Sequence, residues 1–349
     1  MTSVVDDLAV DAPDVASKVG HYYRVDGVYE VGREKIREYA RAVQDFHPAH
    51  WEDEAAAALG YPGLVAPLTF VSIPAMAANK LLFETVVVGY DMFVQTEQVF
   101  EQHKPIVAGD RLIVDVELSS VRTIAGKDLI TVTNTFVDEA GETVHTMHTT
   151  VVGITGDDGV SPEITAAVEN VMLHGVKVFS QDKSAAVETT LRPEGEQVVL
   201  SVAGAARVPS TTLSFDELGV GDELPLRDAR VSRGDLVNYA GVSGDGNPIH
   251  WDEKIAELAG LPDIIAHGML TMGLGAGFVS AWSGDPGAVT RYGVRLSAPT
   301  VVGREGGQVE YTGRVKSLDP ATRTAVVAVT AKSGGRKIFG LATTNLRFR

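Results

Sequence analysis

An internal repeat restricts the fold of this chain more than any other feature, because residues of the first half recur 200 positions later. Further along the chain the spacing shortens to 194 residues, so that Pro105 aligns with Pro299 and Gly109 with Gly303. We therefore expect two copies of one domain. The residue pairs that are identical at a spacing of 200 are Tyr39 and Tyr239, Ala40 and Ala240, Asp45 and Asp245, Pro48 and Pro248, His50 and His250, Trp51 and Trp251, Pro62 and Pro262, and Ala66 and Ala266.

The periodicity of apolar residues is similar in the two copies. In the first copy, residues 33–43 show helical spacing, and residues 66–83 form a long apolar run typical of a buried helix. Strand-like alternation follows, and the second copy repeats this order after an apolar run at 269–279. A helix followed by an antiparallel meander predicts an α+β domain with the helix on one face of the sheet. Strands are expected at 110–121, 128–137 and 143–154, and at 308–315, 324–331 and 337–346.

The stretch between the two copies has a pattern of its own. Ser161 and Pro162 are suited to begin a short helix that reaches about Leu173, and residues 188–203 resemble a strand pair. We interpret this stretch as a connector that packs on the surface. The four segments of the chain are then a flexible acidic arm at 1–20, an N-terminal domain at 21–155, the connector at 156–208 and a C-terminal domain at 209–349.

The composition excludes several kinds of site and partner. The sequence contains no cysteine, which excludes a disulfide framework, a thiolate zinc site and a thiol nucleophile. A net charge of −16 argues against nucleic acid as a partner. The acidic N-terminus lacks the features of a signal peptide, and no apolar run approaches the length of a membrane span. We therefore expect a soluble, cytoplasmic protein.

The charge is distributed unevenly along the chain. Residues 1–155 contain 11 Lys and Arg against 23 Asp and Glu, whereas residues 209–349 contain 15 of each kind. An acidic partner would be repelled less by the C-terminal third, although ordinary solvated surface charge explains the same numbers. Both interpretations remain open. The basic residues concerned are Arg291, Arg295, Arg304, Arg314, Lys316, Arg336 and Lys337.

A polar loop in the second copy combines side chains suited to acid–base chemistry. Asp245, Asn247 and His250 place a carboxylate, an amide and an imidazole within six residues, and Pro248 disfavours a helix through this segment. Two groups of different basicity that converge on one point can move protons in both directions. Taken alone, Asp245 and Asn247 are equally compatible with an Asx turn, and His250 with a structural histidine.

A second part of this candidate site begins 17 residues after His250. There, His267 and Gly268 open the apolar run at 269–279, which we interpret as a buried, glycine-rich helix. The start of a helix offers unpaired backbone N–H groups and a positive dipole end, which suit a developing oxyanion. A carboxylate, an imidazole and an oxyanion donor together predict an acid–base active site.

These motifs resemble those of the hydratase-2 family, which comprises MaoC-like dehydratases and R-specific enoyl hydratases. The resemblance rests on Gly-Asp-x-Asn-Pro-x-His-x-Asp at 244–252 and Ala-His-Gly-Met at 266–269, and it extends over 215–349. It implies a hotdog fold and a reaction that needs no metal or organic cofactor. The residues it implies are Asp245 and His250 as the catalytic pair, Gly268 as the N–H donor to the oxyanion, and Asn247, His267 and Met269 as substrate-binding residues.

Within this family the second copy looks closest to the B subunit of the actinobacterial type-II fatty-acid-synthase (3R)-hydroxyacyl-ACP dehydratase. The first copy resembles the A-type partner subunit, around Asp-Phe-His-Pro-Ala-His at 45–50 and Ala-Pro-Leu-Thr-Phe at 66–70. That resemblance implies a non-catalytic hotdog that binds the acyl chain.

The first copy departs from the motif in a way that agrees with this expectation. At the helix start it has Pro67 and Leu68 instead of a His-Gly pair, and His47 replaces the asparagine of the loop. A bulky side chain at the helix start blocks the approach of a thioester carbonyl. We therefore expect Asp45 and His50 to be structural.

The long apolar run of the first copy, residues 67–83, admits two interpretations. Small residues beside large apolar ones suit a helix, kinked at Pro74, that leaves a narrow channel for an acyl chain. Ala75 is one of the small residues expected to face this channel. The same residues are equally suited to fill a core.

The resemblance and the repeat together predict a double hotdog. The two domains are expected to share one continuous sheet as an internal pseudo-dimer, because a lone hotdog exposes a sheet edge. The expected activity is reversible dehydration of a (3R)-3-hydroxyacyl thioester, on an acyl carrier protein, in fatty-acid or mycolic-acid-type elongation. An R-specific enoyl-CoA hydratase of fatty-acid degradation, a hotdog thioesterase, and a non-catalytic acyl-binding protein remain alternatives.

Overall fold

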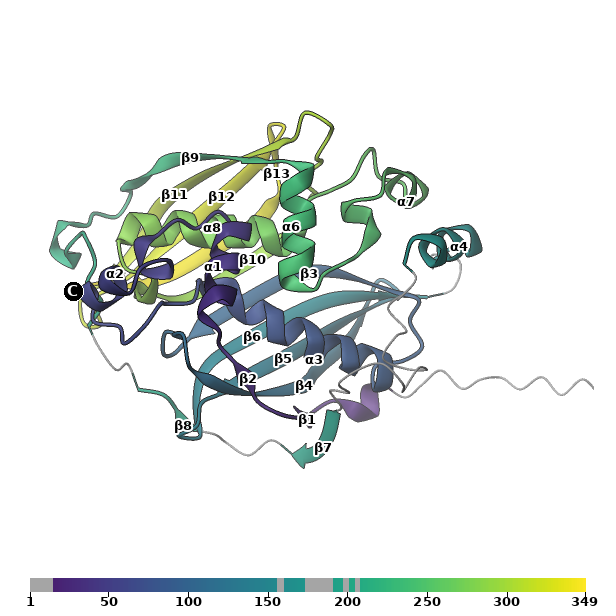
Figure 1. Ribbon diagram of the computed structural model, residues 1–349, viewed down its shortest axis with the longest axis horizontal. Helices are drawn as coiled ribbons and strands as arrows, with labels where there is room; N and C mark the ends of the chain where they lie inside the picture. The colour runs from purple at the N-terminus through teal and green to yellow at the C-terminus, as the bar shows by residue number, and fades with distance from the viewer. Residues whose placement is uncertain (1–14, 156–159, 173–190, 197–200, 205–207) are drawn as a thin grey trace, which may run out of the picture.

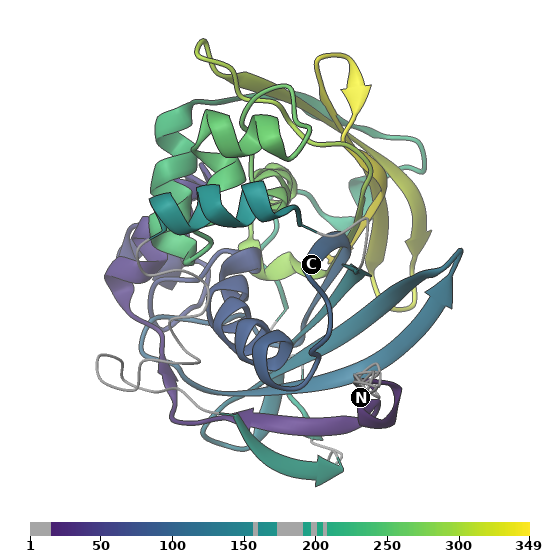
Figure 2. The ribbon, with the colours of Figure 1, turned by 90° about the vertical axis from the view of Figure 1, so that its right-hand side faces the viewer.

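The computed structural model describes residues 15–155, 160–172, 191–196, 201–204 and 208–349. Their strands form one sheet that curves around two central helices, α3 (Ser72–Thr85) and α8 (Gly268–Ser283) (Figures 1 and 2). Each half of the chain is therefore an antiparallel sheet wrapped around its own helix, which confirms the predicted α+β double hotdog. Most of the N-terminal arm and much of the connector lie outside the described residues.

The N-terminal half surrounds α3 with five strands joined in antiparallel pairs. Across the sheet their order is β1 (His21–Val25), β4 (Arg111–Ile124), β5 (Lys127–Val137), β6 (Glu142–Ile154) and β3 (Met92–Gln102). A short strand, β2 (Tyr29–Glu30), pairs with β4. The side of this sheet away from the junction is completed by β7 (Leu191–Glu196), which comes from the connector and pairs with β1.

The C-terminal half repeats this arrangement around α8. The order across its sheet is β10 (Val289–Leu296), β14 (Phe339–Arg347), β12 (Thr324–Ser333), β11 (Gly307–Asp319) and β9 (Glu223–Val231), and β13 (Arg336–Lys337) pairs with β12. Short helices complete both halves: α1 (Arg33–Ala42) and α2 (Asp53–Ala58) in the first, α6 (Arg233–Ser243) and α7 (Glu253–Leu258) in the second. Tyr39 of α1 and its repeat partner Tyr239 of α6 lie in contact, with ring centroids 6.3 Å apart.

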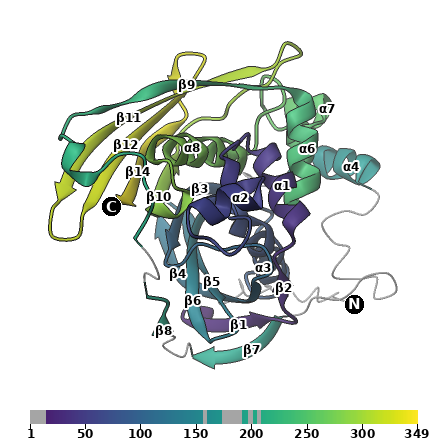
Figure 3. The same ribbon diagram turned by 60° about the vertical axis from the view of Figure 1, so that its left-hand side comes forward.

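The two halves join through β3 and β10, which pair antiparallel in the middle of the sheet (Figure 3). Arg291 and Arg295 of β10 form ion pairs with Glu101 and Glu97 of β3, at 3.3 and 3.4 Å. Partly exposed ion pairs of this kind contribute little stability, so the backbone ladder and the shared core hold the halves together. The predicted continuous sheet is confirmed, and it removes the edge that each hotdog would otherwise expose.

Helix α8 is buried almost all round, and its glycines make this possible. A Cβ atom on Gly273 would lie 2.5 Å from a methyl carbon of Val43, and one on Gly275 would lie 2.5 Å from the Tyr292 hydroxyl. Val43 follows α1 in the N-terminal half, whereas Tyr292 belongs to β10 of the same half as α8. The glycine-rich run therefore lets α8 contact both halves at backbone distance.

The prediction that Pro74 kinks the first central helix is wrong. A 3-10 turn, Leu68–Val71, precedes α3, so Pro74 is the third residue of the helix. A backbone N–H in the first turn has no partner within the helix, and a proline there removes no hydrogen bond.

The connector also differs from its predicted form. Its helix, α4 (Pro162–Val171), begins as predicted, with the Ser161 hydroxyl accepting a hydrogen bond from the Ile164 N–H at 3.2 Å. Residues 188–190 and 197–200 of the predicted strand pair lie outside the described residues. Within the described part of this stretch, β7 pairs with β1 and β8 (Ser201–Val202) pairs with β6, and the two do not pair with each other. Among the helices of the described residues, none is long and apolar enough to cross a membrane.

Candidate active site

The loop after α6 is shaped by local signals in the sequence. Gly244 ends the helix in the left-handed conformation, at φ 81°, which a residue with a side chain rarely adopts. Pro248 then begins a short 3-10 turn, Pro248–His250, which the Asn247 side chain caps by accepting a hydrogen bond from the Ile249 N–H at 3.2 Å. The chain therefore turns sharply between Asp245 and His250, and both side chains face the same cavity.

The tautomer of His250 follows from its backbone contact. Its Nδ1 lies 2.7 Å from the carbonyl oxygen of Ile265, which can only accept a hydrogen bond. In the neutral ring Nδ1 therefore carries the hydrogen, and Nε2 keeps a lone pair. Burial lowers the pKa of His250 below its usual value, although the Asp245 carboxylate opposes this effect. His250 is consequently a neutral base near pH 7.

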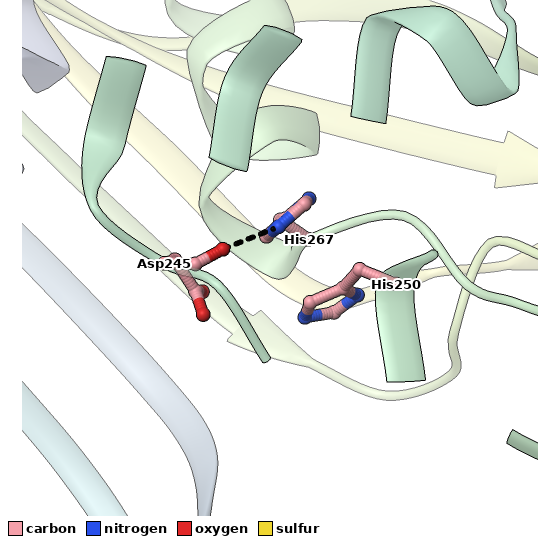
Figure 4. Close-up of side chains that lie close together, drawn as sticks. All are labelled: Asp245, His250 and His267. Carbon is pink, nitrogen blue, oxygen red and sulfur yellow. Dashed lines mark hydrogen bonds between the residues drawn. The ribbon is translucent and has the colours of Figure 1, made fainter. Parts of the chain in front are cut away.

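His267 lies behind His250 and is not among the residues that line the cavity. The two imidazole rings stack, with centroids 3.7 Å apart and planes inclined by 28°. The His267 Nε2–H donates a hydrogen bond to the backbone carbonyl of Asp245 at 3.1 Å (Figure 4). Burial and repulsion from His250 lower the pKa of His267 to about 4. His267 therefore positions Asp245 and His250.

The three residues also form the one potential metal-binding group in the described part of the chain. Ligand atoms of Asp245, His250 and His267 lie within 4.8 Å of one another. The lone pair of an imidazole nitrogen lies in the ring plane, and the planes of the two stacked rings are nearly parallel. Their lone pairs therefore run side by side and do not converge on one ion. Ligand atoms of Asp245 and His250 lie at most 4.8 Å apart, a separation that a single water molecule can bridge.

Gly268 begins α8 beside this pair. His267, the N-cap residue, makes no side-chain capping hydrogen bond, so the side chains of the loop leave the N–H groups of Gly268 and Met269 uncapped. Both residues line the cavity. A Cβ atom on Gly268 would lie 2.8 Å from a methyl carbon of Leu296, which also lines the cavity. The glycine thus keeps open the space next to a helix start that suits an oxyanion.

The cavity has a volume of about 630 Å³ and is lined by both halves of the chain. The C-terminal half contributes Asp245, Asn247, His250, Gly268 and Met269, so five of the six predicted site residues share one cavity, and His267 lies behind it.

Helix α3 contributes the opposite wall of this cavity. Ser72, Met76, Asn79 and Phe83 line the cavity from one face of α3, whereas Ala75 lies on the other face, fully buried in the core. One face of α3 therefore lines the cavity, and the other face fills the core. Ala75 is not the channel-facing residue that the sequence suggested.

The corresponding pair of the N-terminal half is closed. Asp45 and His50 are in direct contact, with Oδ2 and Nε2 3.3 Å apart, and the two side chains are 4% and 0% exposed. Neither lines the cavity. Burial alone would lower the pKa of His50, but the Asp45 carboxylate and the Val65 carbonyl raise it. Burial likewise opposes ionisation of Asp45, but His50 lowers its pKa. This pair is a buried ion pair that lies outside the cavity.

The cavity also contains residues that the sequence analysis missed. Gln95 and Gln98 of β3 and Thr149 of β6 line it from the N-terminal half. Strand β3 was not predicted, because its apolar alternation is interrupted by a bulge between Gln95 and Glu97. The polar run from Gln95 to Gln98, between apolar residues on either side, was the available signal.

Comparison with known proteins agrees with this geometry. Residues 17–147 match the family described as "FAS1-like, dehydratase domain region", and residues 219–333 match "MaoC like domain". A solved structure called "MaoC-like dehydratase" is 64% identical, covers 96% of this chain and 100% of its own, and superposes with a TM-score of 0.86.

Two further relatives cover the chain in different ways. A UPF0336 protein of Mycolicibacterium paratuberculosis is 43% identical over 149 residues, which are 42% of this chain and 94% of that protein. A Mycobacterium tuberculosis protein with a double hotdog fold is 14% identical over 95% of this chain and 96% of its own, with a TM-score of 0.57, and shows similarity of fold alone. The open acid–base pair, the two-domain cavity and the full-length match agree: this chain belongs to the MaoC-like dehydratases and is a hydro-lyase built from two hotdog domains.

Proposed function

We propose that the protein catalyses the reversible dehydration of a (3R)-3-hydroxyacyl thioester to the trans-2-enoyl thioester, on an acyl carrier protein, in fatty-acid or mycolic-acid-type elongation. One observation carries this proposal. Ligand atoms of the Asp245 and His250 side chains lie within 4.8 Å of each other, beside the uncapped start of α8, in a cavity that extends into the other half of the chain.

The hydration direction shows how these groups act. A water molecule lies between Asp245 and His250, and Asp245 accepts a hydrogen bond from one of its hydrogens. His250 Nε2 takes the other proton as the water oxygen bonds to C3. The electrons of the double bond then move to the thioester oxygen, where the Gly268 N–H stabilises the enolate. The imidazolium returns its proton to C2. Dehydration follows the same steps in reverse.

The N-terminal half binds the acyl chain in this proposal and contributes no second active site. Met76 and Phe83 of α3 and Phe93 of β3 offer an apolar wall beyond the reacting end. The closed Asp45–His50 pair and the side chain of Leu68, which is buried where the other half has Gly268, support a single active site.

Charge near the cavity supports an acidic carrier. Ser297, which lines the cavity, donates a hydrogen bond to the Lys337 carbonyl at 3.1 Å, so β13 with Arg336 and Lys337 lies beside the cavity wall. Both side chains are exposed. Docking through exposed charges weakens with salt, so activity on an acyl-carrier-protein thioester should fall with ionic strength more steeply than activity on a coenzyme A thioester. Identical salt profiles would remove this part of the proposal.

An assay of the wild-type protein with short and long enoyl thioesters tests the reaction itself. Stereospecific formation of (3R)-3-hydroxyacyl thioester is the expected result. Release of free thiol without hydration would indicate a thioesterase, and binding without either reaction a non-catalytic acyl-binding protein. A kcat/KM on coenzyme A thioesters that equals the value on acyl-carrier-protein thioesters at every salt concentration would favour a degradative enoyl-CoA hydratase.

A further inference from the structure

A glutamine of the N-terminal half lies against the active-site helix of the C-terminal half. Gln95 of β3 lines the cavity, and its Nε2 lies 3.7 Å from the Met269 sulfur. Its Oε1 lies 3.9 Å from the position that a Cβ atom on Gly268 would occupy. The side-chain amide of Gln95 therefore lies beside the start of α8, where the thioester is proposed to bind.

A hydrogen-bonded chain fixes which end of this amide is free. Gln98 Nε2 donates to the backbone carbonyl of His148 at 2.9 Å, and this contact orients the Gln98 amide. Gln98 Oε1 then accepts from the Thr149 hydroxyl at 3.0 Å and from Gln95 Nε2 at 2.8 Å. A backbone carbonyl can only accept a hydrogen bond, so the Gln98 amide nitrogen faces His148 and its oxygen faces Gln95. The Gln95 amide must therefore turn its nitrogen towards Gln98. The free group next to Gly268 is consequently the carbonyl oxygen of Gln95.

The backbone of β3 is adapted to this arrangement. In a regular strand, residues three positions apart face opposite sides of the sheet. The pairing of β3 with β6 shifts between Gln95 and Glu97, so Thr96 forms a bulge. As a result both Gln95 and Gln98 line the cavity. Gln98 is 1% exposed, so its amide is held in place by its buried surroundings.

A free carbonyl at this position selects for a hydrogen-bond donor on the substrate. The thioester oxygen is an acceptor and gains negative charge during the reaction, so the Gln95 carbonyl cannot bind it. At the reacting end of a (3R)-3-hydroxyacyl thioester, the hydrogen-bond donor is the 3-hydroxyl group.

We propose that Gln95 is a substrate-binding residue supplied by the N-terminal domain, and that its side-chain carbonyl accepts a hydrogen bond from the 3-hydroxyl group. This inference rests on the proposed function, because it assumes a 3-hydroxyacyl thioester. The active site is then shared. Asp245 and His250 act on the attacking water from one domain, and once the 3-hydroxyacyl thioester has formed, the single hydroxyl hydrogen turns from Asp245 to the Gln95 carbonyl of the other domain. A fixed acceptor on the N-terminal side of the cavity favours one configuration at C3.

A thermodynamic cycle isolates this contact. Titration calorimetry would compare 3-hydroxybutyryl-CoA with butyryl-CoA, which lacks only the hydroxyl, in an Asp245→Asn background that prevents turnover. The hydroxyl should strengthen binding about 3- to 10-fold, the range of a neutral hydrogen bond. Adding Gln95→Met, which keeps the length of the side chain but removes the amide, should abolish this advantage. Thr96→Val is the matched control, because Thr96 lines the same cavity and its hydroxyl bonds to the backbone of Thr150.

The outcomes separate this inference from the proposed function. An advantage of the hydroxyl that persists within about twofold in the Gln95→Met variant would overturn the inference, as would equal loss in the Thr96→Val control. If Gln95→Met unfolds, Gln95→Asn serves instead, because it keeps the amide but withdraws it by one methylene and should also lose the advantage. Failure of the wild-type protein to hydrate any enoyl thioester would reject the proposed function, whatever the result of the cycle.

Discussion

Replacing Asp45 by asparagine tests whether the acid–histidine pair of the N-terminal half serves stability alone. The pair is in contact at 3.3 Å with both side chains almost fully buried, so the Asp45→Asn variant would leave His50 without its counter-charge. Removal of one partner of a buried ion pair costs about 3–5 kcal/mol. Because an amide can still contact a neutral imidazole, we expect the lower end, about 3 kcal/mol.

The pH dependence of this loss has a defined sign. The pKa of Asp45 is lowered from 3.8, so its contribution is present above that pH and is lost as the pH falls through the folded-state pKa. The pKa of His50 is raised from 6.5, so its contribution is present below pH 6.5 and is lost as the pH rises through the folded-state value. The ion pair therefore contributes most to the free energy of unfolding between pH 3.8 and pH 6.5.

Urea unfolding of wild type and Asp45→Asn at pH 5.5 and pH 9 measures this difference. We expect the larger loss of unfolding free energy at pH 5.5, together with nearly unchanged hydration of crotonyl-CoA by the folded variant. Glu54→Gln is a matched control, since it makes the same change from acid to amide on an exposed side chain of α2. An inactive but stably folded Asp45→Asn variant would refute the structural role and indicate a second active site. Equal stability of variant and wild type would refute the buried ion pair.

Other predictions concern the active site and the cavity. Because burial lowers the pKa of His250, kcat/KM for hydration should stay level as the pH falls to 6.5 and decrease only below it, whereas a decrease centred above pH 7 would contradict a neutral His250. Met76→Trp should narrow the cavity. It should reduce kcat/KM on long-chain thioesters at least about tenfold and leave kcat/KM on four-carbon thioesters nearly unchanged. Ala75→Phe should instead destabilise the fold by about 1–3 kcal/mol, because Ala75 lies in the core, and equal chain-length profiles for the two variants would contradict this assignment.

Local chemistry explains why much of the fold and the site could be predicted from the sequence. Gly244 and Pro248 shape the loop of Asp245 through backbone restrictions that act within a few residues. The apolar run of α8 and the strands β5 and β12 follow from periodicity alone. One continuous sheet was predicted from the need to cover a sheet edge, although neither β3 nor β10, the strands that join the halves, was itself predicted.

The features that were missed depend on contacts between distant parts of the chain. The bulge at Thr96 breaks the alternation of β3, and it brings Gln95 and Gln98 to one cavity only because β6 pairs beside it. His267 was expected to bind substrate because it belongs to the Ala-His-Gly-Met motif. Its ring stacks on His250 instead, and it does not line the cavity. Periodicity and motif spacing do not contain this information.

The most direct test of the account compares Asp245→Asn and His250→Gln with the Asp45→Asn variant in one assay of crotonyl thioester hydration. The central claim is that the open pair performs the chemistry, so each of the first two variants should lose about 10²–10⁴-fold in kcat, with circular dichroism and melting close to wild type. Asp45→Asn should retain most of its turnover. If either Asp245→Asn or His250→Gln kept a third or more of wild-type turnover, the assignment of this pair as the catalytic centre would be wrong.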